Sequence, residues 1–218
     1  IEECKDMVVF GLASGRNRYL TQEALSTYNI PKPDILICSA GSEIYYTEKF
    51  IPDAGWGSHI DFQWQKDELQ EALLSFPGLH LQESPAQWRF KLSYYVDSSF
   101  DECALANLYK FLSDRKLRAK ILLTENRFLD LLPFRASKGS AVRYLSYKWN
   151  VPPDQIITAG NSGNDFDMLK GKTKGIVVAN YSKELEALKK IKSIYFSKLP
   201  LSRGVLEGIR HHLKQLSG

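Results

Sequence analysis

Cysteine is scarce in this sequence. The 218 residues include only Cys4, Cys38 and Cys103, which are odd in number and far apart. Neither a disulfide framework nor the paired spacing of a zinc site is indicated by such a pattern. A reducing, cytoplasmic location is therefore the expectation.

Long apolar runs and dense blocks of charge are also missing. No apolar stretch approaches the roughly 20 residues that span a bilayer, and no signal-peptide pattern is visible. The net charge of +4 is too mild to demand a nucleic-acid partner, although it is compatible with an anionic substrate. Without a dense basic stretch, Trp56, Trp64 and Trp88 favour a core or a sugar-facing surface over a base-stacking platform. We therefore expect neither a nucleic acid nor a membrane as partner.

What is present is organised around one strand, loop and helix. The apolar run 156–159 predicts a buried strand that ends at Gly160, and Asp165 opens a helix with acidic residues in its first turn. The carboxyl ends of strands are where α/β sheets place functional groups. The carboxylates, amides and hydroxyl of this loop suit a hydrated Mg²⁺ beside a phosphate, whereas an ordinary capped helix explains the same pattern without a ligand.

The N-terminal part has an α/β rhythm. A strand is predicted over 7–13, a polar stop at Ser14-Gly15-Arg16, a helix over 19–28, a strand over 35–39 and a turn over 40–43. Strand, helix and strand in this order favour a parallel sheet. Ser14 follows the first strand, where it is either a phosphate ligand at a helix N-terminus or a helix cap.

The middle of the chain has a different order of predicted helices and strands. Residues 47–59 are expected to be irregular, followed by helix 61–76, strands 79–83 and 89–96, helix 98–115 and strands 119–123 and 128–134. This order lacks a βαβ rhythm and predicts a separate α+β insert. Lys91 lies on the polar face of the second strand, either as a substrate contact or as a solvated lysine.

The α/β rhythm resumes near residue 135. Ser137 is expected to cap a helix that reaches Trp149, with Lys138 in its first turn. A cation there opposes the helix dipole, so Lys138 either meets an anion or points into water. A strand over 175–178 leads to Asn180, and helix 183–191, strand 194–196 and an amphipathic helix over 204–216 follow.

Four short motifs in fixed order carry a resemblance. They are Ser14-Gly15-Arg16, Gly41 to Tyr46, Lys138-Gly139 and Gly160 to Asp165, supported by segments 59–64, 90–95, 130–133 and 204–209. The order resembles the haloacid dehalogenase (HAD) superfamily and, more narrowly, the sucrose-6-phosphate phosphatases and the phosphatase-like C-terminal domain of bacterial sucrose-phosphate synthase. This resemblance implies an α/β fold: a HAD-like Rossmann-type core with a parallel sheet (residues 1–46 and 133–218) and an inserted α+β cap domain (residues 47–132).

The resemblance also implies chemistry. In this family an aspartate at the end of the first strand attacks phosphorus to form an aspartyl-phosphate, and a second aspartate protonates the leaving sugar oxygen. By position, Ser14, Gly15 and Lys138 would contact the phosphoryl group, while Asn161 and Asp165 would hold Mg²⁺.

The same resemblance assigns three residues to the substrate. Glu43 and Lys91 fall in the segments that mark the sucrose-phosphate branch, so they are expected to contact sugar hydroxyls. Asn180 follows the last core strand and is expected to brace the site.

Two departures leave two hypotheses. The family's first strand with its Asp-x-Asp motif is absent, since Asp6 precedes the first predicted strand, and Asn161 stands where an aspartate is usual. We expect a piece of a longer protein: either a Mg²⁺-dependent phosphatase acting on sucrose 6-phosphate, with its nucleophile upstream of Ile1, or a non-catalytic, sugar-phosphate-binding domain of sucrose-phosphate synthase beside its glycosyltransferase domain.

Overall fold

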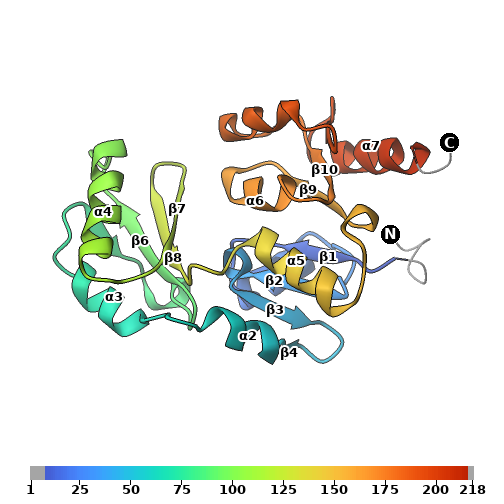
Figure 1. Cartoon of the computed structure of the whole chain (residues 1–218). Helices are drawn as coiled ribbons and strands as arrows, with labels where there is room; N and C mark the ends of the chain where they lie inside the picture. Colours follow the sequence, from blue (N-terminus) through green and yellow to red (C-terminus); the bar gives the residue numbers. More distant parts are fainter. Residues whose placement is uncertain (1–7, 216–218) are drawn as a thin grey trace. The chain divides into compact units, whose positions relative to one another are not determined.

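The computed structural model describes residues 8–215 (Figure 1). The chain divides into two compact units, one ending at Ala136 and the other beginning at Ser137, and each is described by itself. Cys4 and Asp6 lie outside the described residues. No helix within residues 8–215 is long and apolar enough to cross a membrane.

The first unit contains a four-stranded sheet in the order β1-β2-β3-β4. Its elements are β1 (Gly11–Ala13), α1 (Arg18–Thr27), β2 (Ile35–Cys38), β3 (Glu43–Tyr46) and β4 (Ile51–Pro52). β1 and β2 are parallel, as predicted, but β3 and β4 add in antiparallel fashion. Of the strand predicted over 7–13, residue 7 lies outside the described residues and residues 8–10 are not in a strand: Phe10 exchanges main-chain and side-chain bonds with Asp34, and the ladder begins at Gly11.

The prediction that segment 47–59 is irregular is wrong. It holds β4 and most of helix α2 (Ala54–Ile60), whose cap is Asp53: its carboxylate accepts a bond from the Trp56 N–H at 2.9 Å. Burial of Trp56 offsets the low helix propensity of the glycines in this helix. The helix predicted over 61–76 shrinks to α3 (Lys66–Leu73), because Gln63 adopts a left-handed backbone (φ 59°) between the two helices.

A second sheet in the first unit has the order β5-β6-β8-β7 and is antiparallel throughout. Its strands are β5 (Leu79–Leu81), β6 (Leu92–Val96), β7 (Lys120–Thr124) and β8 (Phe128–Leu132), with helix α4 (Glu102–Asp114) between β6 and β7. Figure 1 shows α3 and α4 beside this sheet, and their buried leucines share one core with it. β6 starts later than predicted because residues 88–91 form a tight bridge. The boundaries 47–132 of the cap domain stay a prediction.

The second unit has a parallel sheet in the order β11-β10-β9. Its elements are α5 (Lys138–Lys148), β9 (Ile157–Gly160), α6 (Phe166–Leu169), β10 (Lys174–Val177), β11 (Ile194–Phe196) and α7 (Leu201–Lys214). The helix predicted over 183–191 is a 3₁₀ helix, η6 (Lys183–Lys190). Its two buried leucines, Leu185 and Leu188, are three residues apart and match the 3₁₀ period.

Short 3₁₀ turns complete the fold: η2 (Ser39–Gly41), η3 (Ser84–Ala86), η4 (Pro153–Gln155) and η5 (Gly163–Asp165). Three parallel strand pairings (β1–β2, β9–β10 and β10–β11) and one antiparallel sheet with helices confirm the predicted α/β class with an added α+β portion. Among the described strands, β1 pairs only with β2 and β9 only with β10, so each has one edge without a neighbour.

Candidate functional site

The loop after β9 is built around the carboxylate of Asp165. One oxygen, Oδ2, accepts bonds from the N–H groups of Asn161 (3.0 Å) and Ser162 (3.2 Å) and from the Ser162 hydroxyl (3.2 Å). Ser162 and Asp165 thereby form a capping box at the start of η5. The carboxylate is buried and fixes the backbone of the loop.

Lys138 reaches the other oxygen of the same carboxylate. Ser137 caps α5, as predicted, and the Lys138 Nζ donates to Asp165 Oδ1 at 2.7 Å and to Asn164 Oδ1 at 2.9 Å. The lysine side chain is 5% exposed and that of the aspartate 7%. The alternative that Lys138 points into water is therefore wrong. An ammonium has three N–H donors, so one remains for a further acceptor.

Two glycines make room for this contact. A Cβ on Gly160 would lie 2.6 Å from the Asp165 side chain, and a Cβ on Gly139 would lie 2.5 Å from the main-chain oxygen of Asp167. Real Cβ atoms do not approach this closely. Glycine at both positions is therefore required by the approach of the loop to β9 and of α6 to α5.

The described residues around Asn161 do not complete a magnesium site. The Asn161 amide makes no hydrogen bond to any residue in 8–215, so its oxygen is available as a ligand. The Asp165 carboxylate is already engaged on both oxygens. Over residues 8–215, no group of three or more His, Cys, Asp and Glu side chains is placed to hold a metal. One neutral amide is too little for Mg²⁺, which is held in proteins mainly by carboxylates, phosphates and water.

In the first unit, Ser14 and Gly15 form an open polar turn after β1. The Ser14 Oγ accepts a bond from the Arg16 N–H at 3.1 Å, and the Gly15 N–H has no acceptor among residues 8–215. The alternative that Ser14 caps α1 is wrong, since Asn17 is the cap and accepts from the Leu20 N–H at 3.0 Å. A serine hydroxyl that accepts one bond still has its proton to donate.

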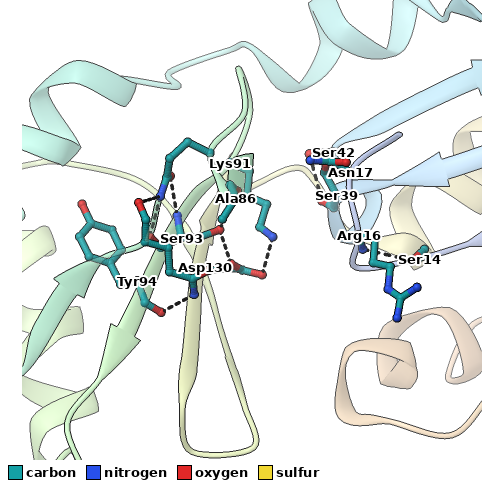
Figure 2. Close-up of polar contacts among 12 residues, drawn as sticks. Ser14, Arg16, Asn17, Ser39, Ser42, Ala86, Lys91, Ser93, Tyr94 and Asp130 are labelled. Carbon is teal, nitrogen blue, oxygen red and sulfur yellow. Dashed lines mark hydrogen bonds and ion pairs between the residues drawn. The ribbon is translucent and has the colours of Figure 1, made fainter. Parts of the chain in front are cut away.

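A left-handed turn between β2 and β3 is hydrogen-bonded to this loop and leads into Glu43. Ser39 (φ 51°), Ala40 (φ 56°) and Gly41 (φ 98°) all have positive φ, a conformation that costs of order 1 kcal/mol for each non-glycine residue. The Ser39 N–H donates to the Arg16 oxygen and the Ala40 N–H to the Ser14 oxygen. These bonds offset the strain and fix the turn against the Ser14 loop. Figure 2 shows Ser14 and Arg16 beside Ser39 and Ser42.

Three donors converge on the Glu43 carboxylate. The Ser39 hydroxyl donates to Oε2 at 2.8 Å, the Tyr45 hydroxyl donates to Oε1 at 2.7 Å, and the Trp88 indole N–H also donates to Oε1. Burial, and then the bond to Glu43, raises the pKa of the Tyr45 phenol well above its usual range, so Tyr45 donates as a neutral hydroxyl. Glu43 is thus a preorganised acceptor, with one lone pair left for another donor.

Trp88 comes from the 84–91 loop, which joins η3 to β6. The Lys66 Nζ donates to the Trp88 oxygen at 2.6 Å, the Trp64 indole donates to the Arg89 oxygen at 3.0 Å, and the Asn17 amide donates to the Pro85 oxygen at 2.9 Å. The loop is therefore held by the cap residue of α1 and by residues at and just before the start of α3.

Beside Glu43 lies a cavity of about 630 Å³. Its walls are aromatic and polar, and include Glu43, Asp61, Trp56, Trp88, Arg89 and Phe90. Aromatic faces together with carboxylates are suited to a ligand that is apolar on one face and rich in hydroxyls at its edge.

Lys91, immediately before β6, is paired with Asp130 of β8. Its Nζ lies 3.2 Å from Asp130 Oδ2, with 13% and 19% of the two side chains exposed, and the Ser93 hydroxyl donates to Asp130 Oδ1 at 2.7 Å (Figure 2). The alternative of a freely solvated lysine is wrong. Lys91 does not line the cavity beside Glu43.

Asn180 follows β10 and its amide oxygen accepts a bond from the Leu201 N–H at 3.0 Å, which holds the start of α7. Sequence reasoning missed Ser39 and Asn17, and it named Trp88 only as a core or sugar-facing residue. Only Asn17 carried a usable signal, since asparagine immediately before a helix is a preferred cap. The left-handed turn at Ser39 and the indole contact of Trp88 arise from tertiary structure.

Comparison with known proteins gives the family. The sequence model described as Sucrose-6F-phosphate phosphohydrolase matches residues 2–213. A putative HAD-like hydrolase of Nitrosococcus oceani is 30% identical over 94% of this chain and 62% of its own length, and sucrose-phosphatase 2 of Nicotiana tabacum is 32% identical over 83% and 44%. The chain thus spans about half the length of these relatives.

Solved structures agree with the fold. The X-ray structure of the sucrose-phosphatase from Synechocystis sp., in complex with sucrose and phosphate, superposes with a TM-score of 0.85 at 27% identity, over 93% of this chain and 83% of that one. A haloacid dehalogenase-like hydrolase from Bacillus subtilis, 18% identical, superposes with a TM-score of 0.68 over 96% and 80% and supports the fold alone. With its motif order, its HAD-like fold and a match over nearly its whole length, this chain belongs to the sucrose-6F-phosphate phosphohydrolase family.

Proposed function

We propose that this chain is the phosphatase-type domain of a protein that hydrolyses sucrose 6-phosphate. The observation that carries the proposal is Lys138, a buried ammonium oriented by Asp165 and Asn164 at the carboxyl end of β9, with one N–H donor unused. A fixed cation of this kind stabilises the charge on a phosphoryl group without reorganising during the reaction.

Ser14 and Gly15 supply further donors in the proposal. The hydroxyl proton of Ser14 and the N–H of Gly15 are both uncommitted among residues 8–215, and the bonds from the left-handed turn hold their loop in place. Both donors suit phosphoryl oxygens, whose charge they stabilise by hydrogen bonding.

We assign the sugar to residues of the first unit. Glu43 has a free lone pair and forms one wall of the aromatic cavity, so it is the proposed acceptor for a sugar hydroxyl. Lys91 is not among the walls of that cavity, so it is the proposed donor to a hydroxyl that extends beyond it, with Asp130 holding its ammonium in place. Asn180 is proposed to support the site indirectly, because its amide oxygen holds the start of α7.

The nucleophile and the metal complete the proposal. The proposed nucleophile belongs to an Asp-x-Asp motif on one further parallel strand, and the edges of β1 and β9 that have no neighbour among residues 8–215 are each compatible with such a strand. Its first aspartate would form the bond to phosphorus as the sugar–oxygen bond to phosphorus breaks, and its second would protonate the departing oxygen. Water would then release phosphate. Mg²⁺ would take Asn161 as one ligand, and Asp165 would hold the loop. The two aspartates of the Asp-x-Asp motif would supply the negative charge that the described residues lack around the ion.

A non-catalytic domain is the second candidate. The observation in its favour is the missing charge at Asn161, together with the full engagement of Asp165. In this alternative the domain binds sucrose 6-phosphate and accompanies the glycosyltransferase domain of a sucrose-phosphate synthase without hydrolysing its ligand.

Phosphate release from sucrose 6-phosphate with Mg²⁺ tests both candidates. The 218-residue chain should release no phosphate above background, whereas a chain extended upstream through an Asp-x-Asp-x-Thr stretch should turn over. In the extended chain Lys138→Met should lower kcat by about 10²-fold or more, the scale of losing one fixed donor, while the exposed Lys172→Met serves as a matched control.

Three results contradict parts of this scheme. Robust turnover by the 218-residue chain would show that the nucleophile is misplaced. If the extended chain releases no phosphate but binds sucrose 6-phosphate in calorimetry, the result would favour the non-catalytic domain. Absence of both turnover and binding would overturn both candidates.

A further inference from the structure

Charge is unevenly distributed along the chain. Residues 137–218 hold fourteen lysines and arginines against six aspartates and glutamates, whereas residues 1–136 hold fifteen against nineteen. The basic character of the protein therefore belongs to the second unit. Lys138 accounts for only one of these cations, and a surplus of this size points to an anionic partner elsewhere on the unit.

Helix α7 is divided into a packed inner face and an open outer face. Gly204, Gly208 and His212 are buried, and His212 Nε2 lies 3.0 Å from the main-chain oxygen of Gly175 on β10. A Cβ on Gly208 would lie 2.5 Å from the Ile176 side chain, so the helix approaches the sheet as closely as glycine allows. The helix is thus held firmly by one side.

The outer face carries a stripe in which cations and leucines alternate. Arg203, Leu206, Arg210, Leu213 and Lys214 are all exposed, and their spacing places them on one side of the helix. Leu206 is 48% exposed and Leu213 51%. The three cations form no salt bridge with any residue in 8–215. This set is called the α7 stripe below.

A groove runs beside the α7 stripe, with a volume of about 430 Å³. Tyr195 and His211, whose rings stack with centroids 4.1 Å apart, line it together with Leu199. Glu207 is the one acidic residue in the lining, and it is already engaged by the Ser197 hydroxyl and by the Lys198 N–H at 2.9 Å. Those bonds, led by the one from Ser197, lower the pKa of Glu207.

We propose that the α7 stripe and its groove dock an acidic protein segment that carries apolar side chains, such as an amphipathic helix of glutamates and leucines. Cations matched to carboxylates, and leucines placed between them, are the complement of such a segment. A nucleic acid would leave the exposed leucines without a partner. A flat bilayer would not enter a concave groove. The experiment below separates binding of a nucleic acid and binding of a bilayer from binding of the acidic segment.

The probe is a fluorescein-labelled helical peptide of glutamate, leucine and alanine, and its binding is followed by fluorescence anisotropy at low ionic strength. The unaltered 218-residue chain should bind the peptide, and a matched peptide with lysine in place of glutamate should not bind. Raising the salt concentration should weaken the binding because the contacts are charged. This test is independent of phosphatase activity, since no residue of the α7 stripe belongs to the proposed phosphate or sugar site.

Charge-matched variants decide the location. The double variant Arg203→Glu/Arg210→Glu should weaken peptide binding at least tenfold, whereas Lys172→Glu/Lys190→Glu, at two exposed positions off the α7 stripe, should change it less than twofold. Leu206→Ser/Leu213→Ser should weaken binding while leaving its salt dependence unchanged. Far-UV circular dichroism checks that every variant is folded.

Three outcomes overturn the proposal. The first is no binding of the acidic peptide by the unaltered chain. The second is an equal loss in the two charge-reversal variants, which would show only a general attraction to a basic unit. The third is tighter binding to phosphatidylserine vesicles or to a single-stranded oligonucleotide than to the peptide, with the same dependence on Arg203 and Arg210.

Discussion

Replacing Asp165 by asparagine removes one negative charge from the centre of the second unit while it keeps the size of the side chain. Lys138 would then have only 5% of its side chain exposed and would have lost its carboxylate partner. Breaking a buried ion pair by removing one partner typically costs about 3–5 kcal/mol, because the remaining ion is left without compensation. We expect a loss of that size in the free energy of unfolding.

The measurement is urea unfolding followed by far-UV circular dichroism and by tryptophan fluorescence, to which Trp149 contributes the signal of residues 137–218 and the other three tryptophans that of the first unit. Amide hydrogen exchange of α5 and of the loop after β9 should show a matching local loss of protection. Asp167→Asn is the control, since its ion pair with Arg143 (3.3 Å) has side chains more than 40% exposed and should be worth about 1 kcal/mol or less.

A double-mutant cycle makes this reasoning refutable. Lys138→Met removes the ammonium that Asp165→Asn leaves without a carboxylate partner. The double variant Lys138→Met/Asp165→Asn should therefore have a higher free energy of unfolding than Asp165→Asn alone. Equal losses for Asp165→Asn and Asp167→Asn, or strictly additive effects in the cycle, would show that burial of the pair does not set its energy.

Gly208→Ala should destabilise the second unit by about 1–3 kcal/mol in urea unfolding, because its Cβ would overlap an isoleucine of β10, and shortening that isoleucine to valine should recover part of the loss. Burial raises the pKa of the Cys38 thiol to about 12, so at pH 8 it stays protonated and a thiol reagent should label the exposed Cys103 alone in a Cys4→Ser background; two labelled thiols in the folded chain would contradict this. Asn161→Asp should strengthen Mg²⁺ binding by about 1–2 kcal/mol in calorimetry of the upstream-extended chain, and unchanged affinity would mean that position 161 does not touch the ion.

The sequence was sufficient where periodicity and chain order agree. The strand before Gly160 and the cap at Ser137 appear as predicted, and the strands predicted over 89–96 and 128–134 appear with shorter bounds, because burial determines those patterns. The motif order also identified the family, since several weak motifs in one order are together specific.

Other features depend on tertiary contacts that no local pattern carries. Helix α2 forms in a glycine-containing segment because Trp56 is buried and its indole donates to the Gly41 oxygen at 3.1 Å. Glu43 was singled out by resemblance, and two of its donors, Ser39 and Tyr45, are close in sequence, but the third, Trp88, lies 45 positions away. The pairing of Lys138 with Asp165 likewise joins residues 27 positions apart. Such contacts are decided when the elements pack, which is why composition and spacing did not reveal them.

The edges of β1 and β9 that lack a neighbouring strand among residues 8–215 have a practical consequence for handling the protein. An edge strand presents a row of main-chain N–H and C=O groups that pair readily with a strand of another molecule. When the 218-residue chain is produced alone, these edges favour association between copies and aggregation at high concentration. A strand supplied in cis or as a peptide that pairs there should keep the protein monodisperse, so solubility itself becomes a readout of how the sheets are completed.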